Sequence, residues 1–407
     1  MASKEKSSSE VRLEERHIGP IPFLHQTCRH ELASTYQPVT TATAAPTTTT
    51  VTGIWRRYQT RDNRKGRHAV VISPESAAKQ GLSHPHPAGT FQASLRGIRR
   101  MFVRYPVFDV SYDVAVIFTL ADGTRHFRYA RGYIGLGVLI QRDTGSLIWV
   151  INGFFAWLPV QWPYTEFVGE EGLGVGITAL IGTTVFELGS VLLVLEAVNE
   201  RRTDCFGWAL EEAMESHGLV LRPDLDNCAH HHPDRHGLLT PRDPEAGKET
   251  RSWQWWPTWE ELRTHYFKEI GFLASFAQLL GATVFWIGGF TSLPSIQDRL
   301  STPAVNGTYW LPQVVGGVGF IISGWLFMVE TQKTWYTPAP KVLGWHIAFW
   351  NLIGAIGFTI CGAAGFSSNQ AAVYTADLST FIGSWAFLIG SVIQWYESLD
   401  KYPVRLQ

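Results

Sequence analysis

Long apolar runs and short polar connections alternate through most of the second half of the chain. Five of these runs are 19 to 24 residues long, and their only Asp, Glu, Lys, Arg or His residues are Glu187 and His346. About 20 helical residues cross the hydrocarbon core of a bilayer, so each run predicts a transmembrane helix. The five predicted spans cover residues 172–195, 270–290, 311–329, 342–362 and 378–396.

A sixth span is predicted before residue 160, in two pieces. Residues 112–120 and 145–159 are each too short to cross a bilayer, but together they make 24 residues with one charge, Asp113. Residues 121–144 lie between the pieces, and two explanations stay open. One is a real insertion that gives a broken, re-entrant helix buried in protein, and the other is a gene-model artefact. The prediction is an all-α, polytopic membrane helix bundle with six transmembrane helices.

Lys and Arg residues flank these spans on alternate sides, which predicts their orientation. Four arginines at positions 96–104 precede the first span, whereas residues 160–171 contain no Lys or Arg. The alternation continues to the end of the chain and places both termini in the cytoplasm. The same topology puts the sequon Asn306-Gly307-Thr308 outside, as a weak glycosylation site close to the fourth span.

Residues 1–108 predict a disordered, partly basic cytoplasmic tail, because a Thr/Ala/Pro run at 39–52 has little to bury. The basic run at 56–67 suits either anionic lipid or a solvated stretch. Residues 91–105 suit a basic amphipathic helix on an anionic membrane surface, or an ordinary positive cluster beside the first span. The remaining units are a first transmembrane hairpin at 109–200, a cytoplasmic loop at 201–265, a second hairpin at 266–330, and a third hairpin with a short tail at 331–407.

An internal repeat relates the spans. The odd-numbered spans share a Gly, an aromatic residue four positions later and two further matches at fixed offsets, beginning at Gly145, Gly281 and Gly354. The even-numbered spans share a Phe followed by a Gly/Ser pair and, ten residues after the Phe, a Glu. This pattern predicts three tandem helical hairpins that pack through small residues. Its even-span members are Phe186 and Glu196, Phe320 and Glu330, and Phe387 and Glu397.

The segment Phe387-Leu388-Ile389-Gly390-Ser391-Val392 and its copies resemble the F-L-I-G-S helix of the YrhK-like membrane domain, a small two-helix family. The whole array, with Gly344-Trp345-His346, resembles multi-pass integral membrane proteins of fungi that carry no assigned activity. The resemblance covers residues 100–407 and implies a fold, but no mechanism. Residues 121–144 depart from its pattern.

Composition narrows the function. Charged residues make up 17% of the 407 residues, against about 25% in soluble proteins, and the net charge is −1. A soluble enzyme, a disulfide-rich scaffold and a nucleic-acid binder are therefore excluded. No catalytic or cofactor motif lies near a membrane face, so we expect no enzyme activity and no cofactor. The cluster formed by Cys228, His230, His231, His232 and His236 lies in a Pro/Asp-rich segment, which favours a solvated loop over a metal site.

Polar residues inside the spans are the candidate binding groups. Glu187, Gln278 and Asn351 lie eight or nine residues from the predicted cytoplasmic ends, so they are expected at one depth. A structural hydrogen-bond network and a transport site both explain such a cluster. His346 suits an interfacial histidine or a proton-handling one. The sequence predicts a structural or scaffold membrane protein in contact with lipid, with a small-solute or proton-coupled transporter as the alternative.

Overall fold

The structure is a computed structural model, and it describes most of the chain with several gaps. The described residues include the predicted spans and the parts of the tail that contact them. Nothing is described between 121 and 144 or between 210 and 252, so both the predicted insertion and the cluster around Cys228 lie outside the described residues. The described residues are 13–18, 20–21, 24–36, 48–67, 69–72, 91–106, 109–119, 145–200, 202–206, 209, 253–401 and 404–406.

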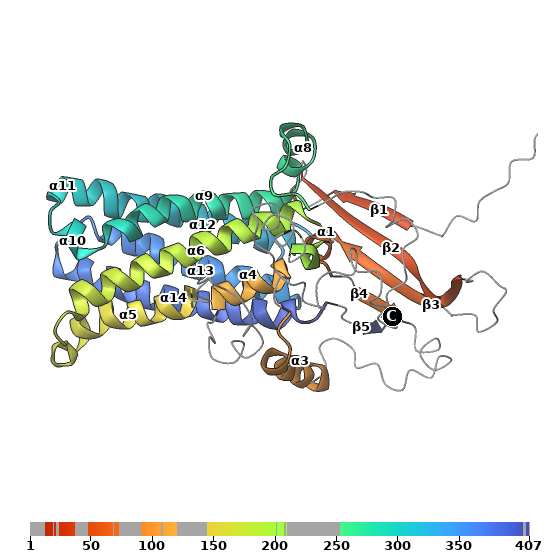
Figure 1. Ribbon diagram of the computed structural model, residues 1–407, viewed down its shortest axis with the longest axis horizontal. Coiled ribbons are helices and arrows are strands. Elements are labelled where there is room, and N and C mark those ends of the chain that lie inside the picture. The colour runs from red at the N-terminus through yellow and green to blue at the C-terminus, as the bar shows by residue number, and fades with distance from the viewer. Residues whose placement is uncertain are drawn as a thin grey trace, which may run out of the picture.

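The protein is mostly helical, with an elongated helix bundle and a small β-sheet at one end of it (Figure 1). We call that end of the bundle the sheet end. The helices are α1 (Thr60–Arg64), α3 (Phe91–Val103), α4 (Val110–Thr119), α5 (Gly145–Gln161), α6 (Val175–Val198), α8 (Trp259–Thr264), α9 (Ile270–Thr291), α10 (Pro294–Gln297), α11 (Thr302–Val305), α12 (Leu311–Glu330), α13 (Leu343–Ala364) and α14 (Gln370–Ser398).

Six helices form a closed ring around the long axis of the bundle. Each packs on the next in the order α5, α6, α9, α12, α13 and α14, and α14 packs back on α5. The helix α4 lies against α6 and α14 near the sheet end. Glycines allow this close packing: a Cβ on Gly281 would lie 2.8 Å from the backbone oxygen of Gly316 on the neighbouring helix. Small residues are the usual means of bringing helices together in lipid.

Among the residues that the structure describes, five helical segments are long and apolar enough to cross a membrane, which confirms the five long predicted spans. They cover Gly172–Val198, Ile270–Thr291, Thr302–Glu330, Leu343–Ala364 and Gln370–Ser398. The helices α4 and α5 are apolar but shorter. Large apolar side chains such as Leu280, Ile322 and Ile382 are exposed on the outside of the bundle, as expected for a surface in contact with lipid tails.

The sheet has five strands in sequential order: β1 (Leu13–Ile18), β2 (His25–Tyr36), β3 (Thr48–Gln59), β4 (Ala69–Ile72) and β5 (Val404–Leu406). The first four pair antiparallel, whereas β5 from the C-terminus pairs parallel with β4. The chain is therefore not purely α-helical. Within the predicted tail of residues 1–108, the structure describes these strands, α1 and α3, and disorder of the rest of the tail stays a prediction. Thr- and Val-rich runs suit strands, and the segment after β3 gains its contacts from ion pairs rather than from apolar burial.

Candidate functional site

Three glutamates converge at the sheet end of the bundle. Glu196, Glu330 and Glu397 lie at the C-terminal ends of α6, α12 and α14, at the same position of the internal repeat. All three are buried, and Glu196 is fully buried. Because a buried carboxylate is costly unless it is paired or hydrogen-bonded, this ring of glutamates requires cations or donors nearby.

The tip of the β3–β4 hairpin supplies the cations. Strand β3 leads into the short helix α1, and the chain turns back at Gly66 (φ +60°), a left-handed conformation that glycine adopts without strain. This tip carries four basic side chains, all at most 15% exposed. We call residues 60–67 the basic tip; its cations are Arg61, Arg64, Lys65 and Arg67.

Two arginines of the basic tip make paired hydrogen bonds to two of the glutamates. The Arg64 guanidinium donates to Glu330 at 2.6 and 2.8 Å, and that of Arg61 donates to Glu397 at 2.8 and 2.6 Å. Arg67 also pairs with Glu397, at 2.9 Å. Burial alone would lower the pKa of Arg64, but the Glu330 carboxylate outweighs it and raises that pKa above its ordinary value. Both arginines are therefore charged at every physiological pH.

Glu196 is paired less closely than the other two glutamates. Its nearest cations are Arg64 Nε at 3.8 Å and Lys65 Nζ at 3.9 Å. Neither carboxylate oxygen has a hydrogen-bond donor. Burial lowers the pKa of Lys65, and the attraction of Glu196 offsets this only in part. Glu196 is thus a buried acidic group whose oxygens are still available to a ligand.

A small cavity lies inside the ring of helices next to these charges. It is bordered by Arg61, Arg64, Lys65 and Glu196, and its volume is about 60 Å³, enough for a few water molecules at roughly 10–15 Å³ each. Polar side chains from several helices line it. Besides the charged groups, they are Ser146, Gln278, Ser323, Asn351, Ser391 and Gln394.

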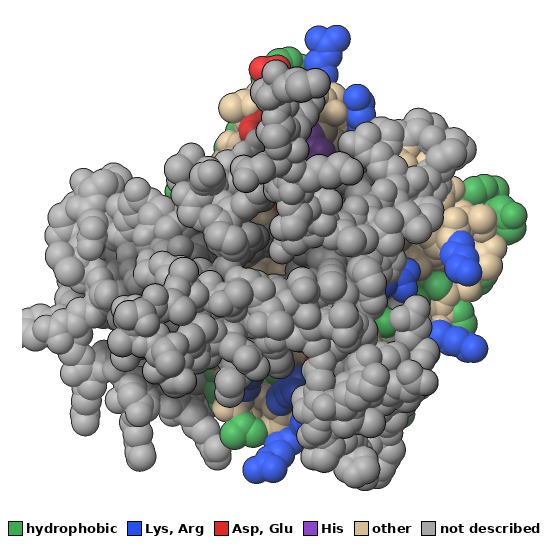
Figure 2. Space-filling model, turned by 90° about the vertical axis from the view of Figure 1, so that its right-hand side faces the viewer, with side chains coloured by type: hydrophobic (Ala, Val, Ile, Leu, Met, Phe, Trp, Pro, Cys, Tyr) green, Lys and Arg blue, Asp and Glu red, His purple; other side chains and the backbone are tan. Residues whose placement is uncertain are grey.

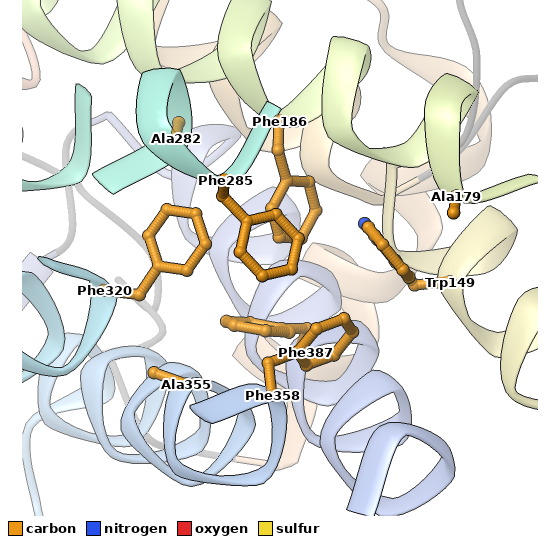
Figure 3. Packing of buried hydrophobic residues seen from close by; sticks show 9 residues of the cluster. All are labelled: Trp149, Ala179, Phe186, Ala282, Phe285, Phe320, Ala355, Phe358 and Phe387. Atoms are coloured by element: carbon orange, nitrogen blue, oxygen red, sulfur yellow. The ribbon is translucent and has the colours of Figure 1, made fainter. Parts of the chain in front are cut away.

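Six aromatic side chains close the centre of the bundle. They come from the repeat positions of both kinds of span and point toward one another (Figure 3). Phe186, Phe320 and Phe387 border the cavity described above, whereas Trp149, Phe285 and Phe358 border a second cavity of about 50 Å³. The second cavity is also partly polar, with Asn152, Thr183, Gln313, Asp377 and Thr380 in its lining. The aromatic cluster therefore lies between two cavities whose linings are partly polar.

The structure brings two of the predicted site residues together and leaves a third apart. Gln278 and Asn351 line the same cavity, as their shared depth predicts. Glu187 does not line it. Its Oε1 accepts a hydrogen bond from Thr283 Oγ1 at 2.9 Å, between α6 and α9, on a partly exposed surface. The expected three-residue cluster is thus a pair at the cavity with Glu187 outside it.

The other two predicted residues have local positions. His346 Nε2 lies 2.7 Å from the backbone oxygen of Pro340, and the choice between an interfacial and a proton-handling histidine stays a prediction. Asn306 lies in a helical turn between α11 and α12. It is part of the same long helical segment that is able to cross a membrane, and its glycosylation stays a prediction.

Sequence reasoning identified the repeat glutamates but did not recognise them as a site. The basic run at 56–67 was expected to contact lipid or solvent, yet its arginines contact Glu330 and Glu397, which lie 266 and 336 residues away. The signal was present in the sequence: three acidic residues at one repeat position need partners, and this run holds several cations. The sequence did not show that the glutamates and the basic run meet in space.

Comparisons with protein-family models, with curated proteins and with solved structures find no match for this chain. The resemblance to the YrhK-like membrane domain therefore stays a prediction from short motifs.

Proposed function

We propose that this protein is a membrane transport protein for a small cation, held in a closed state by its basic tip. The observation that carries the proposal is Glu196, a fully buried carboxylate that borders a partly polar cavity and has no hydrogen-bond donor on either oxygen. Gln278, Asn351 and Ser391, which carry carboxamide or hydroxyl oxygens, line the same cavity. Oxygen groups of this kind replace the hydration shell of a cation in selective pathways.

The proposed path runs along the axis of the helix ring and has two closures. The first is the basic tip, whose guanidinium and ammonium groups lie between Glu196, Glu330 and Glu397. The second is the aromatic cluster between the two cavities. A transported cation would take the place of Arg64 and Lys65 beside Glu196. It would then pass between the aromatic side chains. Transport therefore requires both the basic tip and the aromatic cluster to move.

The proposed membrane architecture is six spans in three hairpins, with α4 and α5 as one broken span. The repeat offsets support it, because α4, α9 and α13 begin at equivalent positions: Val110, Ile270 and Leu343. The pairing of β4 with β5 also supports it. That pairing requires the two ends of the chain to lie on one side of the membrane, and only an even number of spans permits this.

The sheet end is proposed to face the cytoplasm. Described Lys and Arg side chains are prominent at this end and acidic side chains are few in the same view (Figure 2), as the positive-inside rule expects. The helix α3 lies beside it, with Leu95, Ile98 and Phe102 exposed and Arg99 among them. Anionic lipid is the partner that this combination of apolar and basic groups suits.

Ion flux in liposomes tests the transport proposal. The purified full-length protein is reconstituted with K⁺ inside, and K⁺ release is followed with an ion-sensitive dye. Wild-type flux is expected to be low, and replacing Arg61, Arg64 and Lys65 by Ala should raise it at least tenfold. Adding Glu196→Gln to that variant should remove the gain. Glu187→Gln, whose residue lies outside the cavity, is the matched control and should leave the gain unchanged.

A structural or scaffold role is the second candidate, and the paired hydrogen bonds of Arg61 and Arg64 favour it. Buried ion pairs of this geometry fix one segment against another, and removal of one partner costs about 3–5 kcal/mol. In that case Arg64→Ala would lower the thermal stability of the protein strongly, no variant would conduct K⁺, and the isolated tail would capture protein partners. Absence of K⁺ flux from well-folded variants lacking the tip cations would contradict the transport proposal.

A further inference from the structure

A second group of ionisable side chains lies at the sheet end, outside the cavity and the basic tip. It joins Glu200, just after α6, with His265 and Glu269 from the segment between α8 and α9. One ligand atom from each residue lies within 4.8 Å of the other two. Two carboxylates and an imidazole at such distances are able to contact one ion.

Glu269 is the buried member of the group. Its side chain is 4% exposed, and neither carboxylate oxygen has a hydrogen-bond donor. Burial and the neighbouring Glu200 carboxylate raise the pKa of Glu269 well above its ordinary value. Arg64 is the cation whose charge counteracts this rise in the pKa of Glu269, but its guanidinium group already makes two hydrogen bonds to Glu330. Glu269 thus has the Glu200 carboxyl group as its close neighbour, and no basic side chain among the described residues is hydrogen-bonded to its oxygens.

The surrounding hydrogen bonds hold the three residues in place. Asn199, next to Glu200, donates to the backbone oxygen of Gln254 at 2.8 Å and accepts from its backbone N–H at 2.9 Å. The Tyr266 hydroxyl, next to His265, donates to the backbone oxygen of Val198 at 3.1 Å. These contacts join the end of α6 to the segment before α9. The ligand positions are thus fixed by the scaffold rather than by the acidic groups themselves.

We propose that Glu200, His265 and Glu269 form a binding site for a transition-metal dication of the Zn²⁺ type. Zn²⁺ accepts imidazole nitrogen and carboxylate oxygen together, and three protein ligands leave a position for water. Mg²⁺ and Ca²⁺ prefer oxygen ligands alone, so the imidazole selects against them. His265 is exposed, so an ion can reach the site from solvent on that side. Glu269 is buried and provides a ligand in the interior. The bound ion pins the end of α6 to the start of α9.

Zinc titration of the full-length protein in detergent tests this site. The chain also holds Cys228, His230, His231, His232 and His236, which are outside the described residues, so Cys228→Ser and four His→Ala substitutions are made first. Competition with a chromophoric chelator at neutral pH should then show one Zn²⁺ per chain, with no competition from equal Mg²⁺. Glu269→Gln should weaken binding at least tenfold. Glu260→Gln, at an exposed position on α8, is the matched control and should leave the affinity unchanged.

Two results would overturn the site. One is loss of all zinc binding in the background that lacks Cys228 and the four histidines. The other is an unchanged affinity in Glu269→Gln. If that variant does not fold, His265→Ala at the exposed position replaces it: a tenfold loss of affinity supports the site, and an unchanged affinity overturns it.

Discussion

A missing Cβ decides how closely two arginines of the basic tip, Arg61 and Arg64, approach the bundle. A Cβ on Gly271 would overlap Arg64 Nη1, and one on Gly344 would overlap the Arg61 guanidinium. These two glycines occupy the same repeat position, at the second residue of α9 and of α13. The corresponding residue near the start of α4 is Ser111, and Glu196, the repeat glutamate of α6, is paired less closely, with Arg64 at 3.8 Å and Lys65 at 3.9 Å. The two paired arginines thus occupy equivalent places in the repeat: each lies against a repeat glycine and bonds a repeat glutamate.

Gly271→Ala should therefore destabilise the protein. The added methyl group displaces Arg64, which is buried and bonded to Glu330, and overpacking of this kind costs about 1–3 kcal/mol. We expect a lower thermal unfolding temperature in detergent. Gly307→Ala is the control, because no atom lies within 4 Å of a Cβ there. Equal unfolding temperatures for the two variants would contradict the packing argument.

Lys65 should make stability depend on pH. Burial lowers its pKa in the folded protein, whereas the unfolded chain has the ordinary value of about 10.4. Between these two values the unfolded chain binds more protons, so the Lys65 contribution to stability improves as pH rises through that window. Glu196, Glu397, Arg61 and Arg64 are the charges that act on this group.

The check is the unfolding temperature of wild type and Lys65→Met from about pH 7 to pH 10. The wild type should gain stability relative to the variant as pH rises, because other groups titrate equally in both proteins. Parallel curves for the two proteins would mean that Lys65 is not desolvated in the folded state.

At the scale of elements, α4 and α5 depart from the regular pattern of the predicted hairpins. The helix α4 has ten residues and α5 has seventeen, and neither reaches the length of α9. The start of α4 nevertheless matches the repeat, because α4 starts where α9 and α13 start. The interruption falls after Thr119, whose hydroxyl donates to the backbone oxygen of Ala115 inside the helix. Both pieces pack on α6.

Deletion of residues 121–144, with Leu120 joined to Gly145, should leave the protein folded. The joined segment regains the repeat register of the third and fifth spans, so expression and the unfolding temperature should stay close to those of the full chain. Deletion of residues 115–119 is the control and should prevent folding, because Ala115 and Thr119 are fully buried. If both deletions prevent folding, the segment is a required part of the protein, and transcript sequencing should then find it in most messages.

At the scale of the whole molecule, one sheet joins the two ends of the chain across the end of the bundle. Strand β5 lies beside β4 (Figure 1), and Lys401 bonds both Asp109 and the backbone oxygen of Lys65. The basic tip is therefore held from both termini. The basic tip keeps these contacts only if both ends of the chain lie at the same end of the bundle.

Tags on the N- and C-termini should be accessible from the same side of sealed vesicles, because β4 and β5 pair in one sheet. Cysteines at two exposed loop positions extend the test, in a background in which Cys28 and Cys228 are Ser. Lys333→Cys should react with an impermeant maleimide from the side of the tags, and Arg299→Cys from the opposite side. Tags on opposite sides would exclude the six-span arrangement.

The sequence by itself determined the long spans and the repeat, because both depend on properties that neighbouring residues carry. An apolar run of 20 residues is a membrane helix wherever it packs, and five such runs appear as helices at the expected positions. The shared depth of Gln278 and Asn351 was also readable, since helical rise fixes depth. Small residues at fixed offsets likewise indicated which helix faces come close together.

Only the tertiary structure decided where the charges go and which polar groups face inward. Lipid and bundle interior are both apolar, so the sequence of α6 does not show the direction in which Glu187 points, and this residue lies outside the cavity while Glu196 borders it. The basic tip lacks an apolar face and therefore looked disordered. Its order comes from carboxylates more than 260 residues away, and a pairing at that separation has no local signal in the chain.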